Sequence, residues 1–449
     1  MGRPYPLKKE TPFLVHEIFF SRTDKKGIIE SYNNTFVKIS QYTGEQLTGS
    51  PHNIIRHPDM PRAVFRLLWD TINSGRPIGA YVKNLSRTGS YYWVFALAIP
   101  IENGYISLRL KATTPMFQKL PDLMNAMLQI EKIAGMDESS SLLIKTLQQL
   151  GFESYREFMT KALTLELQAR DEALASTRIP TSALTKSKKD RLSAGERMQH
   201  SAHSSFVELT AAAYHIVEIQ KQARIIITSF TELNLLSINM AVCSEHAGSS
   251  GNALSEVTIG FADIANEVQS QIRNFDTRVS SLIESLADSQ FDLGCCRLQT
   301  EMINDFMKEG RSEESSFSTI SDDLELLFKI THESTNRALS RVNSLRQLFE
   351  TFLRTLSELL KTINGLELIR ITGKIEIAKL GGDHGHAFET HINQMAEFLQ
   401  RISGPLRISN ESSIIGVKAT EHSLSALMIL SGNLSEVQIT SKGGKELSA

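Results

Sequence analysis

Two patterns of hydrophobic and polar positions divide the chain. In residues 1–115, short runs of aromatic and β-branched residues are separated by turn residues, which predicts β-strands and hairpins. From about residue 195 onward, apolar residues recur at spacings of three and four, which predicts long amphipathic helices. Apolar residues at helical spacing also predict helices at 120–133, 142–150 and 152–175. We therefore expect an α+β N-terminal domain followed by an all-α C-terminal region.

Five strands are expected in the N-terminal domain. Their predicted ranges are 19–23, 28–32, 80–85, 91–100 and 105–113. A short helical pattern around Phe36 ends near Gly44, and an apolar helix pattern follows Arg62. Two strands, short helices and then three strands is an order that resembles the PAS domain, an α+β fold with a five-stranded antiparallel sheet and short helices.

The stretch 53–69 has the most constrained backbone of this domain. Two prolines in the run RHPDMP, residues 56–61, exclude helical backbone before the first and suit the first helical turn after the second. Arg56, His57 and Asp59 are thus presented from fixed positions, and we interpret the stretch as the ligand-facing segment of a sensor domain. From the residues alone, the alternative is that His57 is a turn histidine satisfied by Asp59.

Several runs resemble the PAS domain of bacterial aerotaxis receptors, over about residues 10–115. They are Tyr32-Asn33-Asn34-Thr35-Phe36, the run GSPHNIIRHPDMP at 49–61, Val82-Lys83-Asn84 and Tyr92-Trp93-Val94. That family holds FAD non-covalently and senses its redox state. The resemblance implies a set of residues near the flavin, namely Asn33, Arg56, His57, Asp59, Trp69 and Asn84.

Two positions depart from the pattern of that family. Ile78-Gly79-Ala80 stands where the family has an aromatic, a small residue and glycine, and Leu85-Ser86 stands where it has two basic residues. Loss of a stacking aromatic is expected to weaken flavin binding by on the order of 1 kcal/mol.

The helical region contains an internal repeat. One heptad array occupies Leu209, Ala212, Ile216, Ile219, Ala223, Ile226, Phe230 and Leu233. A second occupies Val342, Leu345, Phe349, Phe352, Leu356, Leu359, Ile363 and Leu366. Each position of the second array lies 133 residues after its counterpart, and each array alternates spacings of three and four over four heptads, as in a coiled-coil seam. The repeat predicts two helical hairpins.

We expect the two hairpins to form an antiparallel four-helix bundle within one chain, a pseudo-dimer, with a homodimer as the alternative. The helix ends are expected near Ala247, Gly251, Gly310, Ser318, Leu380 and His386. Gly404-Pro405 is expected to break or kink the last helix, because proline lacks the N–H that a helix needs. In the preceding segment, residues 137–140 are expected to cap the helix at 142–150.

The ends of both hairpins resemble the kinase-contacting tip of bacterial chemoreceptors. The first copy matches at Asn234-Leu235-Leu236, Ile238-Asn239, Ala241-Val242, Ala247-Gly248 and Gly251. The second matches at Leu368-Ile369, Ile375-Glu376, Ala378-Lys379, Gly381 and Gly385-x-x-Phe388. Neither copy is complete: Cys243 replaces the acid of the first, and the second lacks both asparagines. The resemblance implies a chemotaxis histidine kinase and its coupling adaptor as partners, without a methylation-site context, since Glu313-Glu314 lies between the hairpins.

Composition excludes several classes of function. Lys+Arg 48 against Asp+Glu 50 leaves no strongly basic face for nucleic acid. Three cysteines, of which Cys295 and Cys296 are adjacent, form neither a disulfide framework nor a zinc pattern. No apolar run reaches the length of a membrane span and the N-terminus lacks a secretory signal, so we expect a soluble cytoplasmic protein. Polar residues at the second hairpin turn are interpreted as loop and cap residues and not as metal ligands: Asp383, His384, His386 and His391.

Two functions remain open. We find no P-loop, GxSxG, HExxH or kinase ATP site, so no enzyme activity is expected. The first function is a sensor in which FAD reports redox or oxygen state and the helical bundle passes the signal to chemotaxis proteins. The second is a cofactor-free scaffold whose bundle docks proteins without controlling a kinase. The predicted divisions are a PAS sensor domain at 1–115, a helical connector at 116–175, a flexible linker at 176–199, and hairpins at 200–315 and 316–440.

Overall fold

The computed structural model describes residues 4–175, 194–246, 252–309, 317–380 and 382–446. By internal contacts the chain forms two compact units. Unit 1 comprises Met1–Phe206, Gln290–Ala338 and Ala426–Ala449, and unit 2 comprises Val207–Ser289 and Leu339–Ser425. Most of the predicted linker at 176–199, the hairpin glycines Gly248, Gly251 and Gly381, the pair Glu313-Glu314, and the side chains of Asp383 and His384 lie outside the described residues.

Unit 1 contains a five-stranded antiparallel sheet in the order β2-β1-β5-β4-β3. Its strands are β1 (Phe19–Asp24), β2 (Ile29–Tyr32), β3 (Ile78–Leu85), β4 (Tyr91–Ile101) and β5 (Gly104–Lys111). The first and last strands of the sequence pattern therefore pair in the middle of the sheet, where Phe19 lies opposite Arg109. All five predicted strands are confirmed, with ends that differ from the prediction by at most two residues.

Short helices connect β2 to β3. They are α1 (Asn34–Ser40), α2 (Gly44–Leu47), the 3-10 helix η1 (His52–Ile55) and α3 (Arg62–Asn73). Asn33 caps α1 by accepting a hydrogen bond from the Phe36 amide. The prediction that the Phe36 helix continues to Gly44 is wrong, because Gln41 adopts left-handed backbone with φ 60° and ends α1, so Gly44 opens α2 instead.

Four helices follow the sheet: α4 (Pro115–Gln118), α5 (Leu120–Ala134), α6 (Met136–Gln149) and α7 (Tyr155–Ala175). The predicted caps at 137–140 are wrong. Gly135, with φ 93°, occupies the N-cap of α6, so the helix begins six residues before the predicted residue 142. Asp137 and Glu138 lie in its first turn, where negative charge is stabilised by the helix dipole.

Both faces of the sheet are buried. On the outer face, the Gly79 amide lies 3.4 Å from Met159 Sδ of α7, and the Tyr155 hydroxyl donates to the Gly79 carbonyl at 3.0 Å. At the other end of the sheet, the rings of Phe20 and Phe306 pack edge to face with centroids 5.1 Å apart. The outer face thus packs against helices, which explains why β3 is almost continuously buried and does not alternate.

One buried carboxylate joins α7 to the sheet. Glu166 is fully buried and accepts hydrogen bonds from the Tyr81 hydroxyl at 2.8 Å, from the Thr114 hydroxyl at 2.7 Å and from the Thr113 amide at 2.8 Å. The Thr113 hydroxyl and the Thr114 amide add two more, at 3.0 and 3.2 Å. Burial and the Glu166 charge raise the pKa of Tyr81, so its hydroxyl stays a donor. These bonds compensate the desolvated charge and fix α7 against β3 and the end of β5.

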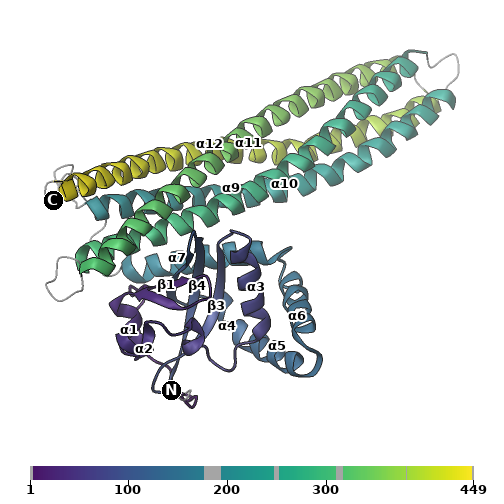
Figure 1. Ribbon diagram of the computed structural model, residues 1–449. Helices are drawn as coiled ribbons and strands as arrows, with labels where there is room; N and C mark the ends of the chain where they lie inside the picture. The colour runs from purple at the N-terminus through teal and green to yellow at the C-terminus, as the bar shows by residue number, and fades with distance from the viewer. Residues whose placement is uncertain (1–3, 176–193, 247–251, 310–316, 381, 447–449) are drawn as a thin grey trace. The chain divides into compact units, whose positions relative to one another are not determined.

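Four long helices form the bundle: α9 (Ala194–His246), α10 (Asn252–Glu309), α11 (Phe317–Leu380) and α12 (Gly382–Glu446) (Figure 1). Every position of both predicted heptad arrays is buried, with at most 8% of its surface exposed. The predicted seam is therefore confirmed. In unit 2, α9 meets α12 at Phe230 and Phe398, with ring centroids 5.1 Å apart, and α10 meets α11 at Phe275 and Phe352, at 5.0 Å.

Of the predicted break or kink at Gly404-Pro405, the break is wrong, because α12 continues through these residues, and the kink stays a prediction. Ile402 and Leu406 are fully buried on either side, so their packing offsets the backbone bond that proline removes. Helix α12 also begins at Gly382, four residues before the expected start at His386.

One described helix, Ala194–Glu245, is long and apolar enough to cross a membrane by length and composition alone. Its heptad positions are buried in the bundle.

The Glu166 network predicts a stability effect in unit 1. Glu166→Gln removes the charge and one acceptor, so we expect the free energy of unfolding to fall by about 2–3 kcal/mol. Both tryptophans of the chain, Trp69 and Trp93, lie in this domain, so urea unfolding followed by tryptophan fluorescence reports it. Glu172→Gln, at an exposed position of the same helix, is the control. Equal unfolding curves for the two variants would contradict the role of Glu166.

Two glycines of α12 predict opposite effects. A Cβ at Gly416 would collide with the ring of Phe349, whereas one at Gly432 would meet no atom within 4 Å. We expect Gly416→Ala to destabilise the protein by about 1–3 kcal/mol through overpacking, and Gly432→Ala to stabilise it by up to about 1 kcal/mol through helix propensity. Thermal melting followed by circular dichroism measures both. Stabilisation by both variants would show that Phe349 has room to move.

Candidate functional site

The candidate site is a cavity of about 220 Å³ between the inner face of the sheet, η1 and α3. Four of the five strands, β1, β3, β4 and β5, contribute residues to its lining. The lining residues are Ser21, Thr23, Lys26, Gly27, Pro51, His52, Asn53, Ile55, Arg56, Phe65, Leu68, Trp69, Ile72, Val82, Asn84, Ala96, Ala98, Tyr105, Ser107 and Arg109.

Small side chains on the sheet create the space. Strand residues two apart share a face, so Ala96 and Ala98 of β4 point the same way, as do Ser107 and Arg109 of β5. The register places Ala96 opposite Arg109 and Ala98 opposite Ser107. Ala96, Ala98 and Ser107 leave space on this face, which the larger Tyr105 and Arg109 of β5 border.

Aromatic side chains lie at the helix side of the cavity. The rings of Trp69 and Tyr105 pack edge to face with centroids 5.3 Å apart, and the Arg56 guanidinium lies 4.0 Å above the Phe65 ring. Gly27 is needed where Trp69 approaches, because a Cβ there would lie 3.2 Å from the indole and because its φ is 77°. The cavity therefore has an aromatic wall opposite a floor of small residues.

Arg109 is the buried charged residue among those that line the cavity, since Lys26 is exposed and Arg56 is half-buried. Arg109 is 3% exposed and donates from Nη2 to the Ser21 hydroxyl at 3.0 Å and to His52 Nε2. Its guanidinium lies 5.3 Å from the centre of the Phe36 ring, on which the His52 ring is also stacked. Among the described residues, no carboxylate pairs with it. A buried guanidinium without a counter-ion is costly, which makes Arg109 unusual.

Burial determines the charge state of this pair. Desolvation lowers the pKa of Arg109 to about 10, and Tyr92 acts in the opposite direction. Desolvation, followed by the Arg109 charge, lowers the pKa of His52 well below its usual value. At neutral pH Arg109 is therefore charged and His52 is neutral, so His52 Nε2 accepts the hydrogen bond.

Three donors on the inner face have no hydrogen-bond partner among the residues that the structure describes. They are Asn84 Nδ2, Arg109 Nη1 and the Tyr92 hydroxyl. Asn84 and Arg109 line the cavity, and Tyr92 lies directly opposite Asn84 across β3 and β4. Buried polar groups are normally paired, so these donors are available to a ligand or water that carries acceptor atoms.

Three of the residues implied by the sequence resemblance line the cavity: Arg56, Trp69 and Asn84. They come from the segment after η1, from α3 and from β3, and an isolated bridge pairs the backbone of Arg56 with that of Asn84. The structure thus brings together residues that lie 28 positions apart in the sequence.

The other three, Asn33, His57 and Asp59, do not line it. Asn33 caps α1, accepts from the Phe20 amide at 3.0 Å and donates to the Ile18 carbonyl at 2.8 Å. His57 is 2% exposed and its Nδ1 accepts from the Asp59 amide at 3.1 Å. Asp59 faces solvent and pairs with Lys83 at 2.7 Å. These contacts hold the cavity wall.

Sequence reasoning missed Arg109, His52 and Ser21. The signal for Arg109 was an arginine in the alternating run SLRLK at 107–111, at the same strand parity as the small Ser107. The two departures from the aerotaxis pattern, 78–80 and 85–86, lie outside the cavity lining. Ala80 and Leu85 are instead buried.

The comparisons with known proteins identify the family of the N-terminal part of the chain. The family model described as PAS fold matches residues 29–108. The chain is 41% identical over 117 residues to the aerotaxis receptor of Escherichia coli (strain K12), a match that covers 25% of this chain and 23% of that protein. The chain thus matches less than a quarter of the length of this relative.

Two solved structures are similar at low TM-score. The PAS domain of a protein from Colwellia psychrerythraea has 21% identity and a TM-score of 0.19, and the match covers 21% of this chain and 85% of that one. The blue-light activated histidine kinase EL346 of Erythrobacter litoralis has 13% identity and a TM-score of 0.22, covering 35% and 53%. On the family model and the match to the aerotaxis receptor, residues 29–108 of this chain form a PAS domain, and the helical region that follows is consistent with a chemoreceptor-like part.

Proposed function

We propose that this protein is a cytoplasmic redox sensor whose PAS cavity binds FAD and whose helical bundle relays the state of the flavin to chemotaxis proteins. The observation that carries the proposal is that the buried Arg109 and the unpaired amide of Asn84 line the same cavity. Similarity to an aerotaxis receptor over the PAS region supports the choice of ligand.

The donors fit the polar edge of a flavin ring. An isoalloxazine presents carbonyl oxygens and ring nitrogens, so Arg109 Nη1 and Asn84 Nδ2 would donate to acceptors that the protein itself does not supply. Trp69 and Phe65 on one side and Ala96 and Ala98 on the other suit a flat aromatic group. The positive charge of Arg109 would favour a ligand state that carries more electron density.

The motif residues divide into two roles in this proposal. Arg56, Trp69 and Asn84 would contact the ligand directly. Asn33, His57 and Asp59 would act as positioning residues, because they hold β1 and the loop between η1 and α3 through hydrogen bonds. FAD, when bound, supplies the reversible redox chemistry that a sensor of this kind requires.

The cavity size favours a second candidate. At about 220 Å³, it is smaller than the roughly 300–1,000 Å³ of most ligand sites. A cofactor-free PAS scaffold, whose bundle docks proteins without controlling a kinase, is consistent with that size. In the sensor proposal the cavity holds the ring of the flavin, and the remainder of FAD lies at its opening.

Two exposed apolar stripes support an output through docked proteins. Stripe one consists of Leu235, Ile238 and Val242 on α9, and stripe two consists of Leu368, Ile371 and Ile375 on α11. All six side chains are 45–65% exposed, and the two stripes are related by the same 133-residue offset as the heptads. Repeated exposed apolar residues on a soluble helix are typical of a protein-binding surface. We propose a coupling adaptor and a histidine kinase as their partners.

The cavity proposal predicts a loss of bound flavin in cavity variants. Arg109→Gln and Asn84→Ala each remove a donor, so we expect FAD affinity to fall by about tenfold or more, the equivalent of one charge-assisted hydrogen bond. The measurement is the flavin absorption of the purified full-length protein and a titration with FAD.

Asp70→Asn is the matched control, because Asp70 lies on α3 next to Trp69 but is exposed and does not line the cavity. It should retain stoichiometric flavin. Wild-type protein that lacks flavin after gentle purification, and that gains none on titration, would defeat the sensor proposal and favour the scaffold.

The stripe proposal predicts that charged substitutions prevent docking. Ile238→Glu on stripe one and Ile371→Glu on stripe two should each weaken binding of the purified coupling adaptor by roughly 10- to 100-fold, as expected for apolar anchors of an interface. Val217→Glu, at a 64% exposed position of α9 outside both stripes, should not. Isothermal titration calorimetry measures all three, and unchanged binding by both stripe variants would place the docking surface elsewhere.

A further inference from the structure

Strand β1 has one face in the cavity and the other against the helical region of unit 1. Ser21 and Thr23 line the cavity. Phe20 and Arg22, which alternate with them, point the opposite way. Phe20 packs on Phe306 of α10, so ligand and bundle share a single strand.

A second contact on this strand reaches α11. Asp323 of α11 is 2% exposed and pairs with Arg22 at 3.0 Å. It also accepts from the Ser31 hydroxyl of β2 at 2.9 Å. Arg22 and Ser31 lie opposite each other, next to a shift in the register of β1 and β2 that leaves Glu30 as an extra residue. The irregular pairing therefore directs two neighbouring strands onto one carboxylate.

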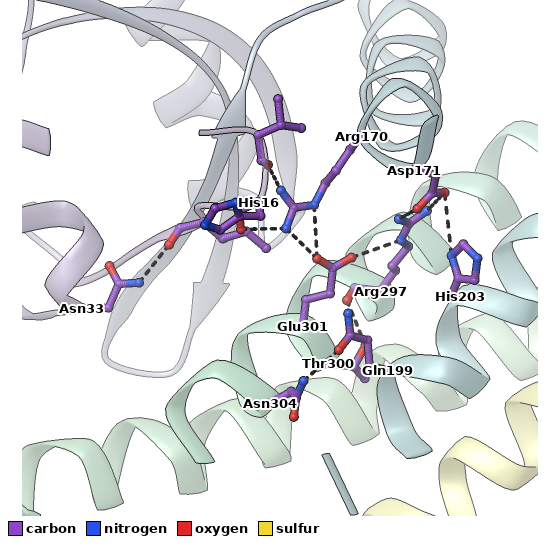
Figure 2. Close-up of polar contacts among 12 residues, drawn as sticks. His16, Asn33, Arg170, Asp171, Gln199, His203, Arg297, Thr300, Glu301 and Asn304 are labelled. Atoms are coloured by element: carbon purple, nitrogen blue, oxygen red, sulfur yellow. Dashed lines mark hydrogen bonds and ion pairs between the residues drawn. The ribbon is translucent and has the colours of Figure 1, made fainter. Parts of the chain in front are cut away.

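The chain segment that enters β1 is held by a buried ion-pair network, shown in Figure 2. Arg170 of α7 donates to the carbonyls of Val15 and His16, the latter at 2.9 Å. The same guanidinium pairs with Glu301 of α10 at 2.9 Å. The segment leading into β1, α7 and α10 are thus connected by one side chain.

The network continues beyond Glu301. Arg297, 1% exposed, donates to Glu301 at 3.3 Å and to Asp171 of α7 at 2.8 Å. His203 of α9 lies 3.7 Å from Asp171 (Figure 2). The Glu301 and Asp171 charges raise the pKa of Arg297 despite its burial. Two arginines and two carboxylates satisfy one another, so the contact is rigid and any displacement of one member leaves buried charge unpaired.

A short path of contacts leads from the cavity to these anchors. Arg109, which lines the cavity, donates to the Ser21 hydroxyl at 3.0 Å. Ser21 is covalently next to both Phe20 and Arg22, whose partners are on α10 and α11. A single hydrogen bond therefore connects Arg109, and any group that it binds, to the strand that contacts both helices.

We propose that β1 transmits the state of the cavity directly to α10 and α11, through Phe20–Phe306 and Arg22–Asp323, while the Arg170 network fixes the start of the strand. This route bypasses the helices α5 and α6, which follow the sheet in sequence. The inference rests on the proposed function of the cavity and adds to it the path by which its state leaves the domain.

The first test is hydrogen exchange of the full-length protein with and without FAD. We expect FAD to slow exchange at residues 290–309 of α10 and 321–338 of α11, but not in α5 and α6. Asp323→Asn keeps an acceptor for Ser31 but removes the ion pair with Arg22, and should abolish the response of α11. Asp137→Asn, which removes the exposed ion pair of α6 with Arg66, is the control and should leave it intact.

The second test uses reciprocity between coupled sites. If the bundle contact and the cavity are coupled, Asp323→Asn should change FAD affinity by about fivefold or more without touching the ligand, and Asp137→Asn should not. A purely structural role for Asp323 would leave FAD affinity unchanged. Protection that appears in α5 and α6 and not in α10 and α11 would overturn the route.

A third variant separates this inference from the choice of ligand. Ala98→Leu fills the cavity floor, next to Ser107, and needs no FAD. We expect it to change hydrogen exchange in β1, at residues 290–309 of α10 and at residues 321–338 of α11. If FAD does not bind but Ala98→Leu changes exchange in these segments, the sensor proposal fails and the route stands. If FAD binds, but neither FAD nor Ala98→Leu changes exchange in α10 and α11, the route fails.

Discussion

The constraint on which unit 1 depends is that both faces of a small antiparallel sheet are buried. A sheet of this kind usually leaves one face to solvent. Here the outer face packs on α7 and on the C-terminal end of α10. The carboxylate of Glu166 accepts hydrogen bonds from hydroxyls and amides that this contact would otherwise bury without a partner. Because the outer face packs against helices, only the inner face is available to a ligand. A displacement of a strand therefore changes the packing on both faces of the sheet.

The bundle is built from a duplicated helical hairpin. Two hairpins with the same heptad positions bury both arrays within one chain, and the copies differ in residue size: Ala212 and Ala223 correspond to Leu345 and Leu356. Close approach is allowed where a small residue faces a large one, as at Gly416 against Phe349. The two copies therefore pack against each other without requiring either copy to be self-complementary.

Much of the fold could be predicted from the sequence because its signals are local. Strand ranges and the heptad seam follow from residue spacing, and all sixteen heptad positions are buried. The site was less predictable. Asn33 and His57 belong to a recognisable motif, yet they hold the wall by hydrogen bonds, while Arg109 enters the cavity only because antiparallel pairing places β5 between β1 and β4. Strand order is non-local, so composition and spacing do not show which inward residue meets a cavity.

A comparison of the buried arginines separates scaffold from site. Arg170 and Arg297 are as buried as Arg109, but each is paired with carboxylates, and their charges are settled within the protein. Among the described residues, Arg109 contacts a serine, a neutral histidine and the face of an aromatic ring. The cost of desolvating a guanidinium is similar in all three cases, so Arg109 is the arginine of the three whose charge a bound group with acceptor atoms would compensate. That inference follows from charge balance alone and does not depend on the identity of the ligand.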